Sequence, residues 1–159
     1  MTPEQRLESM GLKLQDFDAI GYYGHAYGKM KPYHLTGQLL FLSAHVPIWD
    51  GHIVHPGRLG EAVTIEQGYE AGRLTGLNVL AGVKQAVGEL GRITSLVRSI
   101  IFIASAPEFT QVHKVADGMT DVLAEVLGEE KGTGGRAAIG VQRLANDICF
   151  EAWCTFEVE

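Results

Sequence analysis

Arg136 and Glu151 are the residues whose types and surroundings point most directly to chemistry. Arg136 follows a glycine-rich loop at the start of an apolar segment, residues 134–141, and Glu151 stands inside a second apolar segment, residues 148–153. A guanidinium can grip a carboxylate at two points through charge-assisted hydrogen bonds. An acid with apolar neighbours needs a partner or a task, such as orienting and deprotonating a water molecule. We therefore expect a small site for a carboxylate-bearing ligand and a water.

The two apolar segments read as β-strands, and we expect them to be neighbours in one sheet. An arginine held where a loop becomes a strand can point into a cleft while its backbone stays rigid. The structural alternative is a buried ion pair between Arg136 and Glu151 that joins two strands or two subunits.

Length and charge narrow the class of protein. A chain of 159 residues is expected to form one domain with a real hydrophobic core. Its net charge of -6 argues against a nucleic-acid partner, which would favour a basic face. The polar first ten residues do not resemble a signal peptide, and no apolar run approaches the length of a membrane span. We expect a cytoplasmic protein with no membrane contact.

Residues 1–33 are expected to form a short helix and an aromatic arm ahead of a single domain over residues 34–159. Thr2 is a suitable N-cap, and Gln5 completes a capping box. Residues 12–33 read as irregular and are rich in tyrosine. Such an arm packs against the sheet or a neighbouring subunit, or else some of its rings line a ligand pocket.

The remaining elements alternate in a way that is typical of an α+β layer pair. We expect a hairpin over residues 34–43, a helix over 64–87, a buried strand over 95–104, a helix from about 109 to 127, and the two closing strands. One mixed sheet with two long helices on one face accounts for this order. Because residues 100–103 are apolar on both sides of their strand, the other face must also be covered, most simply by other subunits.

Four segments together resemble the Rid (YjgF) family of reactive intermediate deaminases. They are LLFLS at 39–43 with Val46 and Pro47, TIEQGYEA at 64–71 with LNVL at 77–80, IFIASAPEF at 101–109, and GRAAIGV at 135–141 with Phe150 and Glu151. The resemblance covers residues 36–159. It implies a chorismate-mutase-like α+β fold that forms a homotrimer with sites in the clefts between subunits. It also implies hydrolysis of carboxylate-bearing enamines or imines to a keto acid and ammonia, without a metal or an organic cofactor.

The resemblance also assigns roles to individual residues. Arg136 matches the arginine that grips the substrate carboxylate, and Glu151 matches the acid associated with the attacking water. Ser43 matches the serine at the end of the early strand. The two following residues, Ala44 and His45, replace the glycine and glutamine of the well-studied deaminases. His45 could therefore serve as a second acid or base, or be an ordinary polar residue at a strand end.

Three further positions complete the expected substrate-binding set. Asp117 stands where an asparagine is often found, and Ala138 stands where a cysteine often supplies a backbone contact. The family tyrosine that covers the ligand has no clean match, although Tyr22, Tyr27 and Tyr33 are available; we assign Tyr33 to the site. None of the six histidines forms a pair at ligand spacing on a helix, so no metal site is expected.

Two alternatives to a general enamine or imine deaminase remain open. The scaffold could act on another nitrogen-containing carboxylate, for example an aromatic one, which the tyrosine-rich arm and the changed Ala44-His45 segment would suit. It could also be a trimer that binds metabolites without catalysis.

Overall fold

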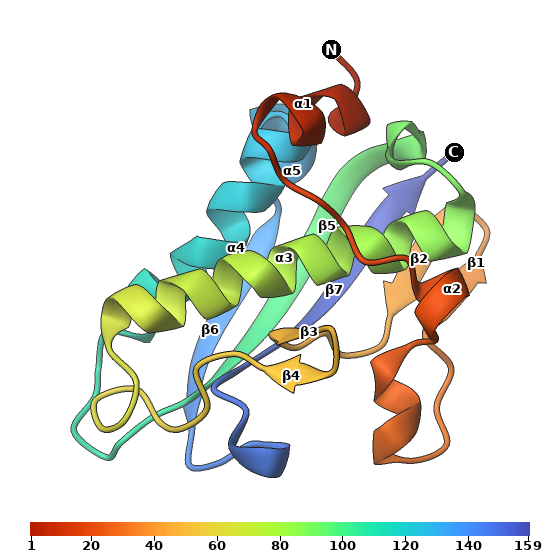
Figure 1. Cartoon of the computed structure of the whole chain (residues 1–159). Coiled ribbons are helices and arrows are strands. Elements are labelled where there is room, and N and C mark those ends of the chain that lie inside the picture. The colour runs from red at the N-terminus through yellow and green to blue at the C-terminus, as the bar shows by residue number, and fades with distance from the viewer.

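The chain folds into two layers, a mixed β-sheet and two long helices that cross one of its faces (Figure 1). The computed structural model describes residues 1–159. The main sheet contains β1 (Tyr33–Thr36), β2 (Leu39–Leu42), β5 (Ile93–Ala104), β6 (Gly135–Val141) and β7 (Phe150–Val158), and a separate hairpin contains β3 (Ile48–Trp49) and β4 (His52–Ile53). The helices are α1 (Pro3–Ser9), α2 (Phe17–Ile20), α3 (Ile65–Val87), α4 (Val112–Leu127) and α5 (Glu129–Gly132), with short 3₁₀ turns η1 (Tyr23–Tyr27), η2 (Leu90–Arg92) and η3 (Ala145–Asp147). This architecture confirms the predicted α+β class.

The order of strands in the main sheet is β1-β2-β7-β5-β6, in which only β5 and β6 run parallel. The expectation that the two closing strands are neighbours is therefore wrong, because β5 lies between β6 and β7. A parallel pair needs a long crossover, and α4 provides it by carrying the chain from β5 to one edge. The other edge of β5 is then free to pair with β7 in the antiparallel sense.

The start of α3 agrees with the sequence prediction, whereas the start of α4 lies later in the chain than predicted. The Thr64 side chain accepts a hydrogen bond from the Gln67 amide, and the Gln67 side chain accepts one from the Thr64 amide in return, so a capping box begins α3 where the sequence predicts a helix. The helix α4 begins at Val112 rather than near residue 109. The residues before it form a turn instead, in which the Phe109 N–H donates to the Ala106 carbonyl at 3.0 Å.

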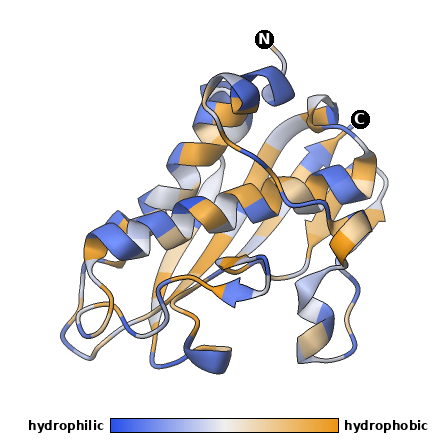
Figure 2. Cartoon of the chain, viewed as in Figure 1, coloured by the Kyte–Doolittle hydropathy of each residue, from blue (hydrophilic) through white to orange (hydrophobic).

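The helices pack closely on each other and on the sheet. A Cβ atom placed on Gly118 of α4 would lie 2.1 Å from the Tyr69 carbonyl oxygen of α3, so only glycine permits this approach. Figure 2 shows hydrophobic and hydrophilic residues alternating along α3, as expected for a helix with one buried side. The main core lies between these helices and β7, β5 and β2.

The N-terminal arm is more ordered than the sequence suggests. Residues 12–33, expected to be irregular, contain α2 and η1. The Asp16 side chain caps α2 by accepting hydrogen bonds from the amides of Asp18 and Ala19. A helix of four residues is too short to show the period on which the prediction relied. Leu7 of α1 belongs to the main core.

The face of the sheet opposite the helices remains apolar and partly open. Leu39, Phe41, Ile139 and Trp153 are 39%, 40%, 41% and 52% exposed, respectively. Along β2 and β7 the exposed side chains alternate with buried ones that face the helices. None of the helices combines the length and apolar composition that a membrane crossing requires.

Candidate active site in two halves

Arg136 and Glu151 lie on opposite faces of the sheet within one chain. Arg136 is aligned with Ser99 of β5, whereas Glu151 is aligned with Phe102. Residues three positions apart on a strand point to opposite faces, and no register shift interrupts β5 between these two positions. Arg136 therefore faces the helices, and Glu151 faces away from them. An ion pair between them inside one chain does not form.

Glu151 opens into a cavity of about 120 Å³ between β7 and the N-terminal arm, which we call the apolar cavity. Eight of the ten residues around it are hydrophobic, and Glu151 is its one charged residue. The arm contributes Tyr22, Tyr23, Tyr27 and Met30. The strand segments contribute Ala44 and Val46, and the turn before β7 contributes Ala145 and Ile148.

The apolar cavity changes the pKa values of Glu151 and Tyr22. Burial raises the pKa of the Glu151 carboxyl above its ordinary value, and the Trp153 side chain opposes this shift. Burial, together with the negative charge of Glu151, raises the pKa of Tyr22 to about 12. Glu151 is therefore a stronger base than an ordinary glutamate, while Tyr22 keeps its proton at neutral pH.

Of the expected residues after β2, Ala44 lines the cavity of Glu151, and Ser43 bonds to the N-terminal arm. Ala44 lies beside Glu151, and its carbonyl accepts a hydrogen bond from the Tyr22 hydroxyl at 2.7 Å. Ser43 lies next to Tyr22, and its hydroxyl donates to the Lys31 carbonyl. Ala44 thus contributes to the Glu151 half directly, whereas Ser43 connects that half to the arm.

His45, expected as a ligand contact or as a polar residue at a strand end, lies inside the protein with only 1% of its surface exposed. Its ring stacks on Phe17, and its Nδ1 shares a hydrogen bond of 2.7 Å with the Tyr23 hydroxyl. Its Nε2 faces Gly82 of α3, where it has no partner. Burial lowers the pKa of His45 to about 3, so the ring is neutral. This position favours a structural role that holds the arm against the sheet.

Arg136, the other candidate site residue, lies at the edge strand β6. Its Nη1 donates to Asp117 Oδ1 at 2.8 Å and to Thr120 Oγ1 at 3.2 Å, both on α4. Its Nε and Nη2 make no hydrogen bond within the protein, so they are available to a ligand. A polar cavity of about 170 Å³ adjoins the guanidinium and reaches the hydroxyl of Ser99, which is buried without a partner. Asp117, which the resemblance placed in the substrate-binding set, is thus a direct partner of Arg136.

The last two expected residues lie on the helix side of the sheet. Ala138 is two positions after Arg136 on β6 and packs against the main core. Tyr33 begins β1, is aligned with the buried Leu42 and also packs against the core. It is therefore separated from Glu151 by the sheet. Tyr22, Tyr23 and Tyr27 are the arm tyrosines that line the cavity of Glu151.

Sequence reasoning missed several residues of the two halves. Met30, Ala145 and Ile148 reach the apolar cavity, and Thr120 reaches Arg136. Of these, Thr120 could have been found, because it lies three residues after Asp117 and therefore on the same side of a helix. The others come from irregular segments whose direction no periodic pattern predicts.

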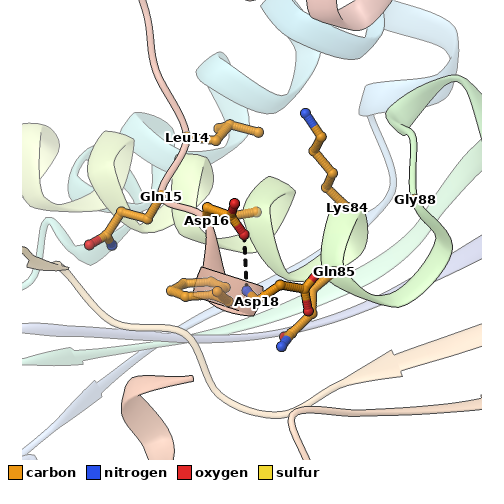
Figure 3. Close-up of a pocket in the computed structure, with 9 residues that line it drawn as sticks. Leu14, Gln15, Asp16, Asp18, Lys84, Gln85 and Gly88 are labelled. Atoms are coloured by element: carbon orange, nitrogen blue, oxygen red, sulfur yellow. Dashed lines mark hydrogen bonds between the residues drawn. The ribbon is translucent and has the colours of Figure 1, made fainter. Parts of the chain in front are cut away.

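A third hollow, of about 280 Å³, lies away from both halves, between α2 and the end of α3 (Figure 3). Asp16, Asp18, Lys84 and Gln85 line it, and Figure 3 shows Asp16 bonded to the backbone of Asp18 rather than directed to a shared centre. None of the expected site residues reaches it. Nowhere in the structure do three or more His, Cys, Asp or Glu side chains gather closely enough to hold a metal ion.

The mixed sheet with two long helices on one face, combined with this order of strands, defines the chorismate-mutase-like α+β class. A family profile described as "YjgF/chorismate_mutase-like, putative endoribonuclease" matches residues 4–149. The chain therefore belongs to the YjgF family.

Individual relatives agree with this assignment. A protein called TCP17 from Trypanosoma cruzi is 35% identical over 112 residues, which cover 70% of each chain. The crystal structure of a "putative endoribonuclease" from Shewanella oneidensis MR-1 matches with a TM-score of 0.90 and 31% identity, over 99% of this chain and 100% of that one. Atu1372 from Agrobacterium tumefaciens, a protein described as having unknown function, matches with a TM-score of 0.88 and 31% identity, over 99% and 92% of the two chains.

Proposed function

We propose that the protein is a hydrolytic deaminase that converts carboxylate-bearing imines, or the enamines in equilibrium with them, into keto acids and ammonia. The observation that carries the proposal is the half-buried Glu151 carboxylate at an apolar cavity, together with an arginine whose Nε and Nη2 are available. These are the two groups that the reaction needs, a base for water and an anchor for the substrate carboxylate.

The reaction balances without a redox partner. Arg136 binds the substrate carboxylate, and the imine nitrogen carries a proton. Glu151 accepts a proton from water as the water oxygen forms a bond to the C=N carbon, giving a tetrahedral aminoalcohol. Glu151 returns that proton to the nitrogen. The C–N bond then breaks, ammonia leaves, and the hydroxyl gives its proton to the Glu151 carboxylate as the C=O bond of the keto acid forms; that proton then passes to ammonia or to solvent. The raised pKa of Glu151 makes its carboxylate a stronger base than an ordinary glutamate, and its conjugate acid is correspondingly easier to form.

We further propose that a complete site combines Arg136 of one protomer with Glu151 of a neighbour in a homotrimer. The two residues face opposite sides of the sheet in one chain, so a single small ligand cannot bridge them there. The open sheet face with Leu39, Phe41, Ile139 and Trp153 supports association, because burial of such side chains stabilises an interface. Arg136 lies on the edge strand, where a neighbour can approach it.

The first experiment measures ammonia released from freshly generated 2-aminoacrylate. We expect wild type to accelerate release, and Arg136→Ala and Glu151→Gln to lose most of the acceleration. Arg143→Ala and Glu157→Gln are matched controls, because both residues are exposed and lie outside the two halves. Absence of acceleration by wild type, both with 2-aminoacrylate and with the imines of larger keto acids, would refute the deaminase proposal, provided that the sample is a trimer.

The second experiment tests the shared site by mixing the two inactive variants. If each site uses two protomers, random reassembly of Arg136→Ala with Glu151→Gln restores about one quarter of the sites in any cyclic oligomer. If each site belongs to one protomer, every site in the mixture lacks one residue. No recovery after verified subunit exchange would contradict the shared site.

Glu151→Gln also separates catalysis from binding alone. An enzyme loses turnover while it retains much of its affinity for a keto acid, whereas a binding protein has no turnover to lose. The name endoribonuclease, used for a relative, suggests RNA as another substrate. The net charge of -6 disfavours a polyanion, and we expect no cleavage of single-stranded RNA.

A further inference from the structure

The apolar cavity beside Glu151 is a preformed space rather than a gap under a loose loop. Tyr22 is only 4% exposed, and its hydroxyl donates to the Ala44 carbonyl at 2.7 Å. The Tyr23 hydroxyl accepts a hydrogen bond of 3.0 Å from the Val46 amide. The wall that the arm contributes is thus fixed to the strand segment that follows β2.

The opposite wall is fixed to the arm as well. The Asn146 side-chain amide, in the turn between β6 and β7, donates to the Tyr27 hydroxyl at 3.2 Å. Asn146 adopts a left-handed backbone conformation with φ of 54°, which asparagine tolerates better than most residues. Ile148, two residues later, also lines the cavity and is 3% exposed. The cavity is therefore bounded on two sides before any ligand arrives.

The chemistry of the cavity disfavours anionic and uncharged polar side chains. Glu151 is its one charged group, so a negatively charged substituent would meet repulsion there. A polar substituent would lose its hydration against a lining that is mainly hydrophobic. An apolar substituent meets neither cost.

We propose that this cavity binds the side chain of the substrate, and that the enzyme prefers α-imino acids with a branched aliphatic or aromatic side chain to those with a methyl group. The inference rests on the proposed function, because it places the reacting carbon next to Glu151. That carbon carries the carboxylate, the nitrogen and the side chain. With the carboxylate at Arg136 and water at Glu151, the side chain is the substituent directed into the cavity.

The volume agrees with substituents of this size. The cavity measures about 120 Å³, and a dry apolar cavity of about 150 Å³ holds a benzene ring. A branched four-carbon side chain therefore fits, and a phenyl ring fits with its edge directed to the open side. Tyr27 and Met30 border that side and are 39% and 37% exposed.

Binding of stable keto acids tests the subsite without requiring turnover. Titration calorimetry would compare pyruvate, 4-methyl-2-oxopentanoate and phenylpyruvate on the wild-type protein. We expect the two larger acids to bind on the order of tenfold more tightly than pyruvate, since each buried carbon adds to the affinity. Ala145→Leu places a larger side chain at the exposed rim of the cavity and should reduce this ratio toward one. Ala19→Leu is the matched control, because Ala19 is exposed on α2 and does not line the cavity.

Ammonia release from the corresponding imines, measured in parallel, separates failure of this inference from failure of the proposed function. Selective binding that Ala145→Leu abolishes, without ammonia release, would support the subsite and refute the deaminase. Rapid release with the same rate for methyl and branched substrates would support the deaminase and overturn the subsite. Equal binding of all three acids, or a preference that Ala145→Leu leaves intact, would also overturn it.

Discussion

His45 should make the free energy of unfolding strongly dependent on pH in the acid range. Its pKa is about 3 in the folded protein and 6.5 as a free side chain, because the folded interior does not solvate the imidazolium. Between these two values the unfolded chain binds a proton that the folded chain does not. The free energy of unfolding therefore falls as the pH decreases below 6.5, and the full contribution of the neutral ring is present only above that pH.

The expected effect is large. A gap of about 3.5 between the two pKa values corresponds to at most about 5 kcal/mol, with a slope that approaches about 1.4 kcal/mol per pH unit. Domains of this kind are stable by about 5–15 kcal/mol in total. This one histidine could therefore remove a large fraction of the stability by about pH 4.

Urea unfolding from about pH 7.5 to about pH 4.5 measures this slope. His45→Asn keeps an acceptor for the Tyr23 hydroxyl but cannot titrate, so we expect a less stable protein with a flatter pH dependence. His113→Asn, at an exposed position on α4, should retain the wild-type slope. Several protein concentrations would separate subunit dissociation from unfolding. Equal slopes for His45→Asn and wild type would refute the reasoning.

Three further predictions concern packing, capping and catalysis. Gly118→Ala places a Cβ atom 2.1 Å from the Tyr69 carbonyl oxygen and should destabilise the protein by about 3 kcal/mol or more in thermal or urea unfolding. As a control, the Cβ atom of Gly91→Ala meets nothing within 4 Å, so this variant should change the stability by less than about 0.5 kcal/mol. Similar effects of the two substitutions would contradict the close packing of α3 and α4. Thr64→Ala removes the N-cap of α3 and should cost about 1 kcal/mol, with Thr64→Ser as the variant that restores it; no loss in the alanine variant would contradict the role of the cap. In the ammonia-release assay, kcat/KM should rise with pH as the Glu151 carboxyl, whose pKa is raised, loses its proton. This rising part of the pH profile should be absent from the residual activity of Glu151→Gln. An unchanged pH profile in that variant would exclude Glu151 as the base.

The elements themselves could be predicted because their signals are local. The capping box of Thr64 and Gln67 and the spacing of apolar residues place α3 to within one residue of its start. The run of apolar residues over 100–103 identifies β5 as an interior strand, and in the sheet it lies between β7 and β6. These features depend on neighbours within a few positions of the chain, which the sequence displays directly.

Which of the candidate residues lie beside Glu151 depends instead on the face of the sheet to which each side chain points. Ala44 and His45 are consecutive, so their side chains point to opposite faces, and only one of them can lie beside Glu151. The pairing of His45 with Ala152 decides which one, and it directs the histidine toward α3. Likewise, Tyr33 and Tyr22 are equally plausible as residue types, but β1 directs Tyr33 to the helix side. No local pattern contains this information.

The sequence by itself determined which segments form helices and strands, and it identified Arg136 and Glu151 as the strongest candidates for chemistry. It also determined the family membership that the profile confirmed. Only the tertiary structure decided that β5 separates the strands of Arg136 and Glu151 and that the two residues face opposite ways. The physical reason is that pairing and register join residues far apart in the chain, and a shift of one position reverses the face of every side chain.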